Sequence, residues 1–471
     1  MIFSSFLFLW CFLPPLLILY FSVKSPVYRN VLLLIASLIF YAWGEPYYVF
    51  LMMASVTANY FLGQWVGGAS TPKMKKTAVL IGTLINLLIL AHFKYTDFLI
   101  DNLNILLSLE ISAKEIPLPI GISFYTFQAI SYLVDIYRGE VKPQRNFIKM
   151  GLYIAFFPQM VAGPIIKYHD IEDQLTKRNI TPEMFNYGVS RFIFGFAKKI
   201  LLANIAGKAA DTIFALEAAD LSTPAAWAGA IAYSLQIYFD FSGYSDMAIG
   251  LGRMFGFTFQ ENFNYPYVSS SIQEFWRRWH ISLATWFKQY VYIPLGGSRA
   301  GTFRTYLNIF IVFFLTGLWH GAAWNFVIWG IWNGLFLMFE RAVDFNKRVL
   351  NPIVRHIYTL LIVIIGMVIF RTNTIGEAIA YVSHMFSFKN MDTSYLNILV
   401  TNEPRLAIIA ALICSGPFVM IWRKYKDKWL QYVPPYLQGS FYMETAKILL
   451  FVLSILALAG NSYNPFIYFR F

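Results

Sequence analysis

Cysteine is scarce in this chain of 471 residues, in which Cys11 and Cys414 are the two present. Both lie in apolar runs, so neither a disulfide framework nor a thiolate metal site is expected. The sequence also lacks the GxSxG elbow, the HExxH zinc motif and the Walker phosphate loop. We therefore expect no metal and no tightly bound cofactor.

Charge is scarce as well. Charged residues make up 13% of the chain and hydrophobic residues 58%, whereas a soluble domain averages about 25% charged residues. Apolar runs recur at the length of roughly 20 residues that a helix needs to cross a bilayer. We predict an all-α, polytopic integral membrane protein with about 10–13 spanning or re-entrant helices. The expected organisation is a single transmembrane domain over residues 1–471.

The charge that is present is unbalanced, with 37 basic and 25 acidic residues and a net charge of +12. Lys and Arg collect in the cytoplasmic loops of membrane proteins, which explains this excess. No nucleic-acid motif accompanies it, so nucleic acid is not expected as a partner. Lys24 and Arg29 follow the first apolar run, residues 2–20, which we interpret as a retained first span with an external N-terminus.

Three segments depart from a plain spanning pattern. Residues 97–115 mix apolar and polar side chains and predict a short amphipathic helix at the interface. Residues 152–166 are apolar but interrupted by proline and glycine, as in bent or re-entrant helices that line a cavity. Residues 260–304 are aromatic and basic, which predicts helices on the cytoplasmic face rather than a full span.

Two of the six histidines lie in apolar, tryptophan-rich sequence: His280 in FWRRWHISLATWF and His320 in FLTGLWHGAAWNF. A charge at membrane depth costs roughly 2.5 kcal/mol or more, so function is the default interpretation. A neutral His320 could accept a proton from a hydroxyl. Trp324 follows at i+4 and is predicted to share the helix face of His320. A buried histidine that hydrogen-bonds across helices is the competing interpretation of His320, and an interfacial aromatic belt is that of His280.

Basic and aromatic residues around the histidines suggest a substrate site. The turn PLGGSR, residues 294–299, could cradle phosphates, although a plain glycine turn is the more frequent meaning of such a sequence. Arginines beside tryptophans also occur in interfacial aromatic belts, where they reach toward water. The candidate substrate-binding residues are Trp276, Arg277, Arg278, Lys288, Arg299, Trp319, Trp324 and Asn325.

A polar cluster interrupts the apolar run at YFDFSGYSD. It consists of Asp240, Ser242, Tyr244 and Asp246. Because buried carboxylates need partners, we predict a structural polar lock, with an arginine of residues 276–280 as the candidate partner. Direct catalysis by these carboxylates is the alternative.

The two histidine segments together resemble the signature of the membrane-bound O-acyltransferase family. The resemblance is closest to the bacterial branch that contains the alginate O-acetyltransferase membrane subunit. The stretches PLPIGISFYTFQAISYLVD, FFPQMVAGPI and YFDFSGYSDMAIGLGRMFGF support it. The resemblance thus defines a signature core over residues 117–334, followed by C-terminal spans over residues 335–471.

The resemblance implies helices that enclose a central tunnel, with His320 and His280 as the catalytic residues: His320 lies near the tunnel, and His280 falls on the family's upstream polar position. It implies an enzyme of a bacterial cytoplasmic (inner) membrane. Acetyl would pass from cytoplasmic acetyl-CoA, the donor substrate, across the membrane for O-acetylation of an exported or cell-surface polysaccharide. The implied partners are the lipid bilayer, the polysaccharide acceptor and a separate extracytoplasmic SGNH-hydrolase-like acetyltransferase.

The chain departs from many relatives at two places: Lys288-Gln289 replaces an Arg-Asp pair, and Asn333 replaces a histidine. Two similar reactions stay open, D-alanyl transfer to teichoic acid and O-acetylation of peptidoglycan. A transporter is an alternative of another class, because broken helices also fit transporters. Transporters normally repeat their halves, and this sequence shows no such repeat.

Overall fold

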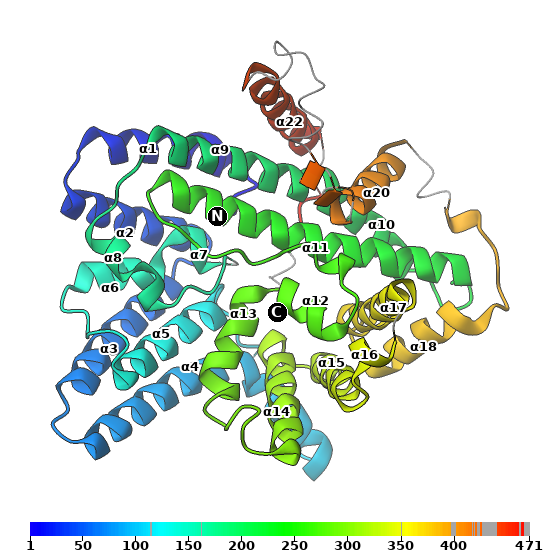
Figure 1. The fold of residues 1–471 in the computed structure, drawn as a ribbon, viewed down its shortest axis with the longest axis horizontal. Coiled ribbons are helices and arrows are strands. Elements are labelled where there is room, and N and C mark those ends of the chain that lie inside the picture. The colour runs from blue at the N-terminus through cyan, green and yellow to red at the C-terminus, as the bar shows by residue number, and fades with distance from the viewer. Residues whose placement is uncertain are drawn as a thin grey trace. The chain divides into compact units, whose positions relative to one another are not determined.

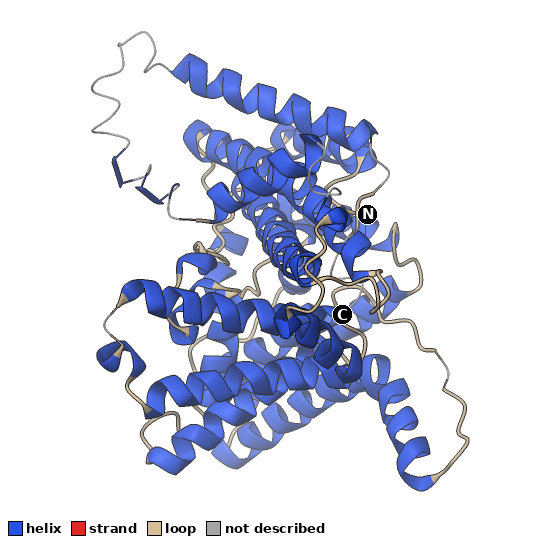
Figure 2. Ribbon diagram, turned by 90° about the vertical axis from the view of Figure 1, so that its right-hand side faces the viewer, coloured by secondary structure: helices blue, strands red, loops and turns tan. Residues whose placement is uncertain are grey.

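The computed structural model describes residues 1–113, 115–161, 163–349, 351–396, 402–416, 418, 420–421, 424–425, 440–460 and 463–465. Within these ranges every regular element is a helix (Figure 2), which confirms the all-α prediction. Two compact units are present, one of Met1–Phe192 with Met247–Gln260 and one of Ile193–Asp246 with Glu261–Phe471. The divisions fall within the helices Pro182–Ala197 (α9) and Thr223–Met254 (α11) and between Gln260 and Glu261.

The first unit runs from blue through cyan into green in Figure 1 and holds a π-helical segment and the first helices. They are η1 (Leu7–Phe12), α1 (Leu13–Ser22), α2 (Pro26–Ala42), α3 (Tyr48–Gly68), α4 (Pro72–Leu107), α5 (Ile122–Arg138), α6 (Phe147–Ala155), α7 (Phe157–Met160), α8 (Tyr168–Thr176) and most of α9 (Pro182–Ala197).

The second unit contains the two histidines of interest and the remaining elements. They are η2 (Lys198–Ala203), α10 (Asn204–Phe214), most of α11 (Thr223–Met254), η3 (Pro266–Val268), α12 (Ile272–Arg278), α13 (Ile281–Phe287), η4 (Lys288–Tyr292), α14 (Thr302–His320), α15 (Trp324–Ala342), α16 (Phe345–Arg348), α17 (Pro352–Arg371), α18 (Ile375–Ser387), η5 (Ser394–Leu396), α20 (Asn402–Ser415) and α22 (Ser440–Gly460).

Several long helices begin with a polar cap followed by proline. The pairs are Ser25–Pro26 at α2, Thr71–Pro72 at α4 and Asn351–Pro352 at α17. In each case the cap side chain accepts a hydrogen bond from a backbone N–H of the first turn, at 2.9 to 3.4 Å. Proline lacks an N–H that would otherwise be unsatisfied there, so this pair fixes where a helix starts.

Two predictions about irregular segments have different outcomes. The expected interfacial helix over residues 97–115 is wrong, because α4 continues to Leu107 without a break and ends at Ser108, which adopts φ 51°. No proline or glycine interrupts residues 83–107, so the helix has no reason to stop earlier. The predicted break in residues 152–166 is confirmed: α6 ends at Ala155 and the short α7 follows at Phe157–Met160.

In the second unit, α14 and α15 lie side by side (Figure 1) and approach each other backbone to backbone. A Cβ atom at Gly330 would lie 2.3 Å from the carbonyl oxygen of Phe313, and one at Gly317 would lie 2.4 Å from that of Phe326. Only glycine fits such a crossing, which is the small-residue packing common between membrane helices. The crossing places Trp329 of α15 against His320 at the end of α14.

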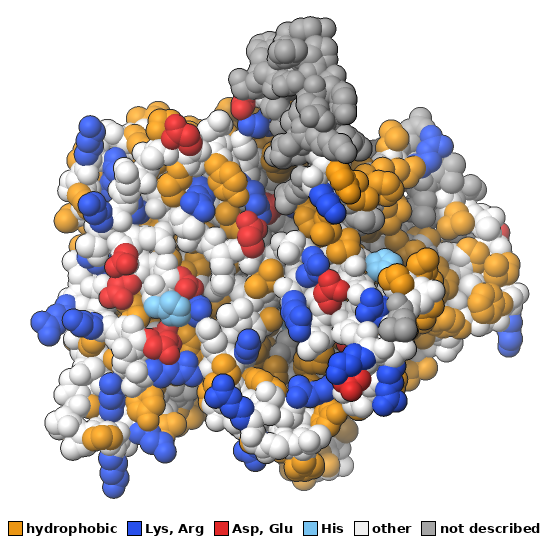
Figure 3. All heavy atoms as spheres, in the orientation of Figure 1, with side chains coloured by type: hydrophobic (Ala, Val, Ile, Leu, Met, Phe, Trp, Pro, Cys, Tyr) orange, Lys and Arg blue, Asp and Glu red, His pale blue; other side chains and the backbone are white. Residues whose placement is uncertain are grey.

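Apolar side chains are exposed alongside charged ones (Figure 3). Ile39 on α2, Leu88 on α4 and Ile357 on α17 are 53%, 58% and 60% exposed, as expected of side chains that meet lipid. Among the described residues, α3, α4, α14 and α17 are long and apolar enough to cross a membrane. Shorter apolar helices cover residues 7–22, 26–42 and 404–415. The chain is therefore a multi-pass membrane protein, and the number of 10–13 spans stays a prediction.

Candidate active site

His320 is the last residue of α14 and is 6% exposed. Aromatic rings surround its imidazole: the centroids of Trp319, Trp329 and Phe370 lie 5.0, 4.9 and 5.3 Å from it. Trp329 and Phe370 both meet the imidazole nearly at right angles. The α14 helix begins at Thr302, so His320 lies about 27 Å along the axis from that end at 1.5 Å per residue. The sequence prediction of a histidine deep in an apolar environment is confirmed.

His280 lies in the turn between α12 and α13 and is 1% exposed. Its φ angle is +43°, a left-handed conformation that is uncommon for a residue with a side chain and frequent at functional sites. Its Nδ1 lies 3.1 Å from Oδ1 of Asn262, and the edge of Phe241 packs against its ring at 4.6 Å. Burial, with nearby His320 as a second cause, lowers the pKa of His280 well below its ordinary value. The imidazole is thus neutral at physiological pH.

One tryptophan contacts both histidines. The ring of Trp319 lies 6.0 Å from the ring of His280 and 5.0 Å from that of His320. Trp319 is itself 5% exposed. Residues that are forty positions apart in the sequence therefore share one aromatic environment in the second unit.

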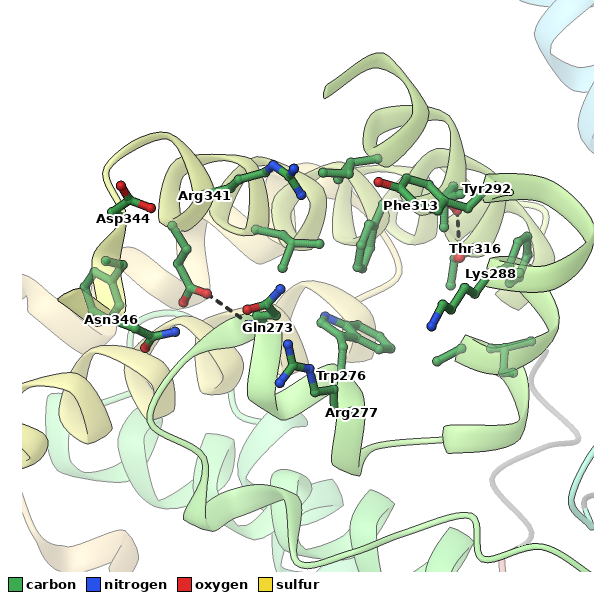
Figure 4. Close-up of a pocket in the computed structure, with 18 of the residues that line it drawn as sticks. Gln273, Trp276, Arg277, Lys288, Tyr292, Phe313, Thr316, Arg341, Asp344 and Asn346 are labelled. Carbon is green, nitrogen blue, oxygen red and sulfur yellow. Dashed lines mark hydrogen bonds between the residues drawn. The ribbon is translucent and has the colours of Figure 1, made fainter. Parts of the chain in front are cut away.

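A pocket of about 510 Å³ lies in the same unit (Figure 4). Trp276, Ile309 and Phe313 supply much of its apolar wall, and Thr316 lines it one helical turn before His320. Four cationic side chains also line it: Arg277, Lys288, Arg341 and Lys347. The acidic lining residues are Glu340 and Asp344. The pocket therefore combines an apolar wall with a net positive lining.

Glu340 and Asn333 of α15 hold α12 against this pocket. The carboxylate of Glu340 accepts hydrogen bonds from the backbone N–H groups of Ile272 (2.6 Å) and Gln273 (3.0 Å), at the first turn of α12. The indole of Trp276 donates to Oδ1 of Asn333 at 3.3 Å. Asn333 thus orients a tryptophan of the pocket.

Three of the eight candidate substrate-binding residues line the pocket, and five do not. Trp276, Arg277 and Lys288 line the pocket. Arg278 instead pairs with Glu274 at 2.9 Å, and Arg299 is exposed on the turn before α14. Neither of these two arginines lines the pocket.

The residues after His320 do not lie where their sequence spacing predicted. Trp324 was predicted on the helix face of His320, and this is wrong: α14 ends at His320, Gly321 is extended with φ −165°, and Trp324 starts α15 with 53% exposure. Asn325 is buried and donates to the backbone oxygen of Thr372 at 2.8 Å, which ties the start of α15 to the end of α17.

The polar cluster of α11 is buried, as predicted. Asp240 forms an ion pair with Lys199, and the side chains of both are 4% exposed. Asp246 pairs with Lys198 at 2.6 Å, while Ser242 and Tyr244 are buried on the same helix. The predicted arginine partner from residues 276–280 is wrong, because Arg278 is engaged with Glu274 and the cations supplied to the cluster are lysines of η2.

Sequence reasoning missed four residues around the site. Arg341 and Lys347 follow the signature core, and no motif marks them. Asn262 and Glu340 act through hydrogen bonds to residues 18 and 68 positions away. The sequence offered one signal, at Glu340. A carboxylate near the end of an apolar helix is costly unless it is partnered, so it indicates that Glu340 bonds to another residue.

The first unit contains a separate group of potential metal ligands: Asp135, Glu140 and His169, whose ligand atoms lie within 4.8 Å of one another. Nδ1 of His169 lies 3.2 Å from Asp135, and its Nε2 lies 3.0 Å from Asp170. Both ring nitrogens of His169 thus already face carboxylates, and the group forms a local ion-pair network.

Comparison with known proteins places this geometry in context. Residues 142–370 match the profile of MBOAT, the membrane-bound O-acyltransferase family. The chain is 43% identical to the probable alginate O-acetylase AlgI of Pseudomonas putida over 489 aligned positions, covering 100% of both chains. It is 33% identical to the peptidoglycan O-acetyltransferase of Helicobacter pylori, over 84% of this chain and 82% of that protein. Identity to the teichoic acid D-alanyltransferase of Bacillus subtilis is 28%, over 46% of this chain and 58% of that one.

Proposed function

The chain belongs to the membrane-bound O-acyltransferase family, and we propose that it passes acetyl groups from cytoplasmic acetyl-CoA across the membrane to a polysaccharide. The proposed product is an O-acetyl ester on an exported or cell-surface polymer such as alginate. Sequence identity favours acetyl transfer over D-alanyl transfer, because the alginate-type relative aligns at 43% identity over the whole chain and the D-alanyltransferase at 28% over 46% of it.

The observation that carries the proposal is a pocket whose wall includes Thr316, one helical turn before His320, although neither His320 nor His280 lines it. Its volume of about 510 Å³ falls within the roughly 300–1,000 Å³ of small-molecule sites. Arg277, Lys288 and Arg341 suit the phosphates of a coenzyme A thioester, and the apolar wall suits its pantetheine arm. Thr316 lines the pocket about 6 Å along the axis of α14 from His320, at 1.5 Å per residue. A thioester held in this pocket would have its acyl end directed toward the histidine.

The distribution of charge supports a cytoplasmic opening. The pocket is lined by the C-terminal end of α15 and by Lys347 of α16, and Arg304 lies in the first turn of α14 at the same end. Lys and Arg concentrate on the cytoplasmic side of membrane proteins. We therefore assign this end to the cytoplasm of a bacterial inner membrane, with the acetyl group travelling along α14 toward His320 and outward.

The chemistry that this site supports is acyl transfer by general base catalysis. A hydroxyl oxygen, of the polymer or of a relay nucleophile on an extracytoplasmic hydrolase-like partner, attacks the thioester carbonyl carbon. His320 accepts the hydroxyl proton as the new C–O bond forms. The C–S bond then breaks, and the proton passes to the departing thiolate of coenzyme A. General base help of this kind contributes about 10²–10⁴-fold to a rate.

The test is consumption of labelled acetyl-CoA by purified protein in nanodiscs, with release of free coenzyme A as the readout. Wild type should consume the donor, and His320→Ala should lose about 10²–10⁴-fold of that rate. His92→Ala, which replaces an exposed histidine of the first unit, is the matched control and should keep wild-type activity. Consumption of carrier-bound D-alanine in place of acetyl-CoA would instead establish the D-alanyl reaction. Substrate movement that survives loss of both site histidines would establish a transporter.

A further inference from the structure

We propose that Asn262 is a positioning residue that holds His280 in one neutral tautomer, with hydrogen on Nδ1 and a lone pair on Nε2. In this state His280 accepts a hydrogen bond from an N–H or O–H group of a bound substrate. This inference deepens the proposed function and rests on it for the identity of the substrates. The tautomer itself follows from the geometry of the turn at residues 280–282.

The identity of the atom that faces His280 is fixed by a backbone group. Oδ1 of Asn262 lies 3.1 Å from the backbone nitrogen of Ser282 and 2.9 Å from the Oγ of Ser282. A backbone N–H can only donate, so the Asn262 atom that receives it must be the amide oxygen. A reversed amide would point its own N–H₂ group at the N–H of Ser282. The orientation of Asn262 is therefore determined by chemistry.

The tautomer of His280 follows directly. The same Oδ1 lies 3.1 Å from Nδ1 of His280. Because an amide oxygen can only accept, Nδ1 must carry the hydrogen, and in a neutral ring Nε2 then keeps its lone pair. The hydrogen bond from Nδ1 to Asn262 therefore makes Nε2 of His280 a hydrogen-bond acceptor.

The loop that carries Asn262 also determines the path of the backbone at this turn. The carbonyl oxygen of Asn262 accepts a hydrogen bond from the N–H of Ile281 at 2.9 Å, and the Asn262 side chain is fully buried. Backbone and side chain of a single residue thus contact His280, Ile281 and Ser282 together. Such a clamp explains how His280 is held at φ +43°, a conformation that persists only where the surroundings enforce it.

Nε2 of His280 is buried and makes no hydrogen bond to any residue that the structure describes. Its surroundings are aromatic: Phe241 from α11 at 4.6 Å, Phe263 from the loop after α11 at 6.4 Å, and Trp319 from α14 at 6.0 Å. Among the residues that the structure describes, His320 is the titratable group whose charge acts on His280. A buried acceptor in an apolar setting calls for a donor, and the two donors in the proposed reaction are a pantetheine amide N–H and the hydroxyl that receives acetyl.

The first experiment reads the tautomer directly and does not depend on activity. Protein labelled with ¹⁵N-histidine in nanodiscs would be examined by NMR, with His280→Gln to assign the signal. The expected spectrum shows His280 with a protonated Nδ1 and an unprotonated Nε2, and Asn262→Ala should produce a mixture of tautomers. A protonated Nε2 in the wild type, or an unchanged signal in Asn262→Ala, would overturn the proposal whatever the enzyme transfers.

The second experiment uses the pH profile of acetyl-CoA consumption. A neutral imidazole accepts a hydrogen bond only above its pKa, so activity falls as pH drops through that value. In Asn262→Asp the carboxylate can still accept from Ser282, but it stabilises the imidazolium. The acidic limb should therefore move to higher pH by about one unit, while Asn262→Ala should lose at least about tenfold in kcat/KM without a defined shift.

Asn308→Ala provides the control for simple structural damage. Asn308 is another fully buried asparagine of the second unit, and its side chain donates to the backbone oxygens of Leu295 and Gly297. Asn308→Ala should leave the acidic limb of the pH profile at its wild-type position.

The kinetics of Asn262→Ala identify which substrate group donates the hydrogen bond to His280. A rise of KM for acetyl-CoA assigns this donor to pantetheine, and a loss of kcat or a higher KM for the acceptor assigns it to the hydroxyl. If the wild type does not consume acetyl-CoA, the proposed function alone is contradicted. If the wild type is active and the acidic limb of Asn262→Asp stays at the wild-type pH, the role of Asn262 is contradicted.

Discussion

The indole N–H of Trp276 donates to Oδ1 of Asn333, and the amide nitrogen of Asn333 in turn donates to the backbone oxygen of Trp329 at 2.8 Å. Trp276 packs against Phe313 at 5.3 Å and against Trp329 at 5.7 Å, and Trp329 contacts His320 at 4.9 Å. Trp276 thus stands between the pocket and the rings around His320, and Asn333 fixes its orientation.

Trp276→Ala should change which acyl groups the enzyme accepts. Removing the indole extends the pocket toward Trp329, so butyryl-CoA and hexanoyl-CoA should gain at least about tenfold relative to acetyl-CoA, since each buried methylene is worth about 0.8 kcal/mol. The measurement is kcat/KM for a series of acyl-CoA donors of increasing length. Trp324→Ala, at an exposed tryptophan, is the control and should keep the acetyl preference. An unchanged acyl-group preference in Trp276→Ala would show that other residues limit the length of the acyl chain that the enzyme accepts.

Arg341→Ala should weaken binding of the donor. The residue lines the pocket (Figure 4), and loss of one cation that meets a phosphate near solvent should raise KM for acetyl-CoA about fivefold, or about 1 kcal/mol. The effect should shrink at high salt because exposed charges are screened. Arg299→Ala removes the same charge outside the pocket and should leave KM unchanged. Equal effects of the two substitutions would mean that the general charge of this surface, and not the pocket, attracts the donor.

Glu340→Gln should disturb α12 and with it the pocket. The carboxylate accepts from two N–H groups at the start of a seven-residue helix, where negative charge is favourable. An amide offers one oxygen and turns an N–H₂ group toward a donor, which should cost about 1–2 kcal/mol and lower kcat/KM about tenfold. Glu377→Gln changes a carboxylate that accepts from the backbone N–H of Asn373 at the start of α18 and should not affect transfer. Wild-type kinetics in Glu340→Gln would show that α12 is held by its other contacts.

Lys199→Met should destabilise the protein strongly. It leaves Asp240 buried without its lysine, which should cost about 3–5 kcal/mol. The double variant Lys199→Met/Asp240→Leu should recover much of that loss, because it removes the buried charge as well. Lys198→Met is the comparison, since Lys198 is 31% exposed and its loss should cost about 1 kcal/mol. Thermal unfolding in detergent measures the order of stability of these variants. A double variant less stable than Lys199→Met would contradict the role of the ion pair.

The sequence predicted the helical membrane fold and the two histidines because both signals are local. An imidazole within an apolar run stands out by its cost alone, whatever surrounds it in space. The separation of Trp324 from the helix face of His320 could not be predicted, because it depends on α14 stopping at His320, and the glycine that follows permits either a stop or a continuation. The partners of Asp240 were equally hidden, since Lys199 lies forty-one positions earlier and an arginine would have served the same electrostatic need.

The binding residues were partly hidden for a related reason. Arg277 and Lys288 belong to a recognisable signature, whereas Arg341 and Lys347 meet them only after α14 and α15 fold back on each other. The role of Asn262 depends on a hydrogen bond between a loop and a turn 18 positions apart. Side-chain spacing on one helix carries no information about such contacts.

Four cations line the pocket, and this has a consequence for how the cell would control the enzyme. Free coenzyme A keeps every phosphate of acetyl-CoA and lacks only a two-carbon group, so the same arginines and lysines should retain it almost as tightly after the reaction. Spent coenzyme would then compete directly with fresh donor for the pocket. The rate of acetylation should accordingly follow the ratio of acetyl-CoA to free coenzyme A rather than the amount of either, which makes the decoration of the polymer a readout of carbon supply.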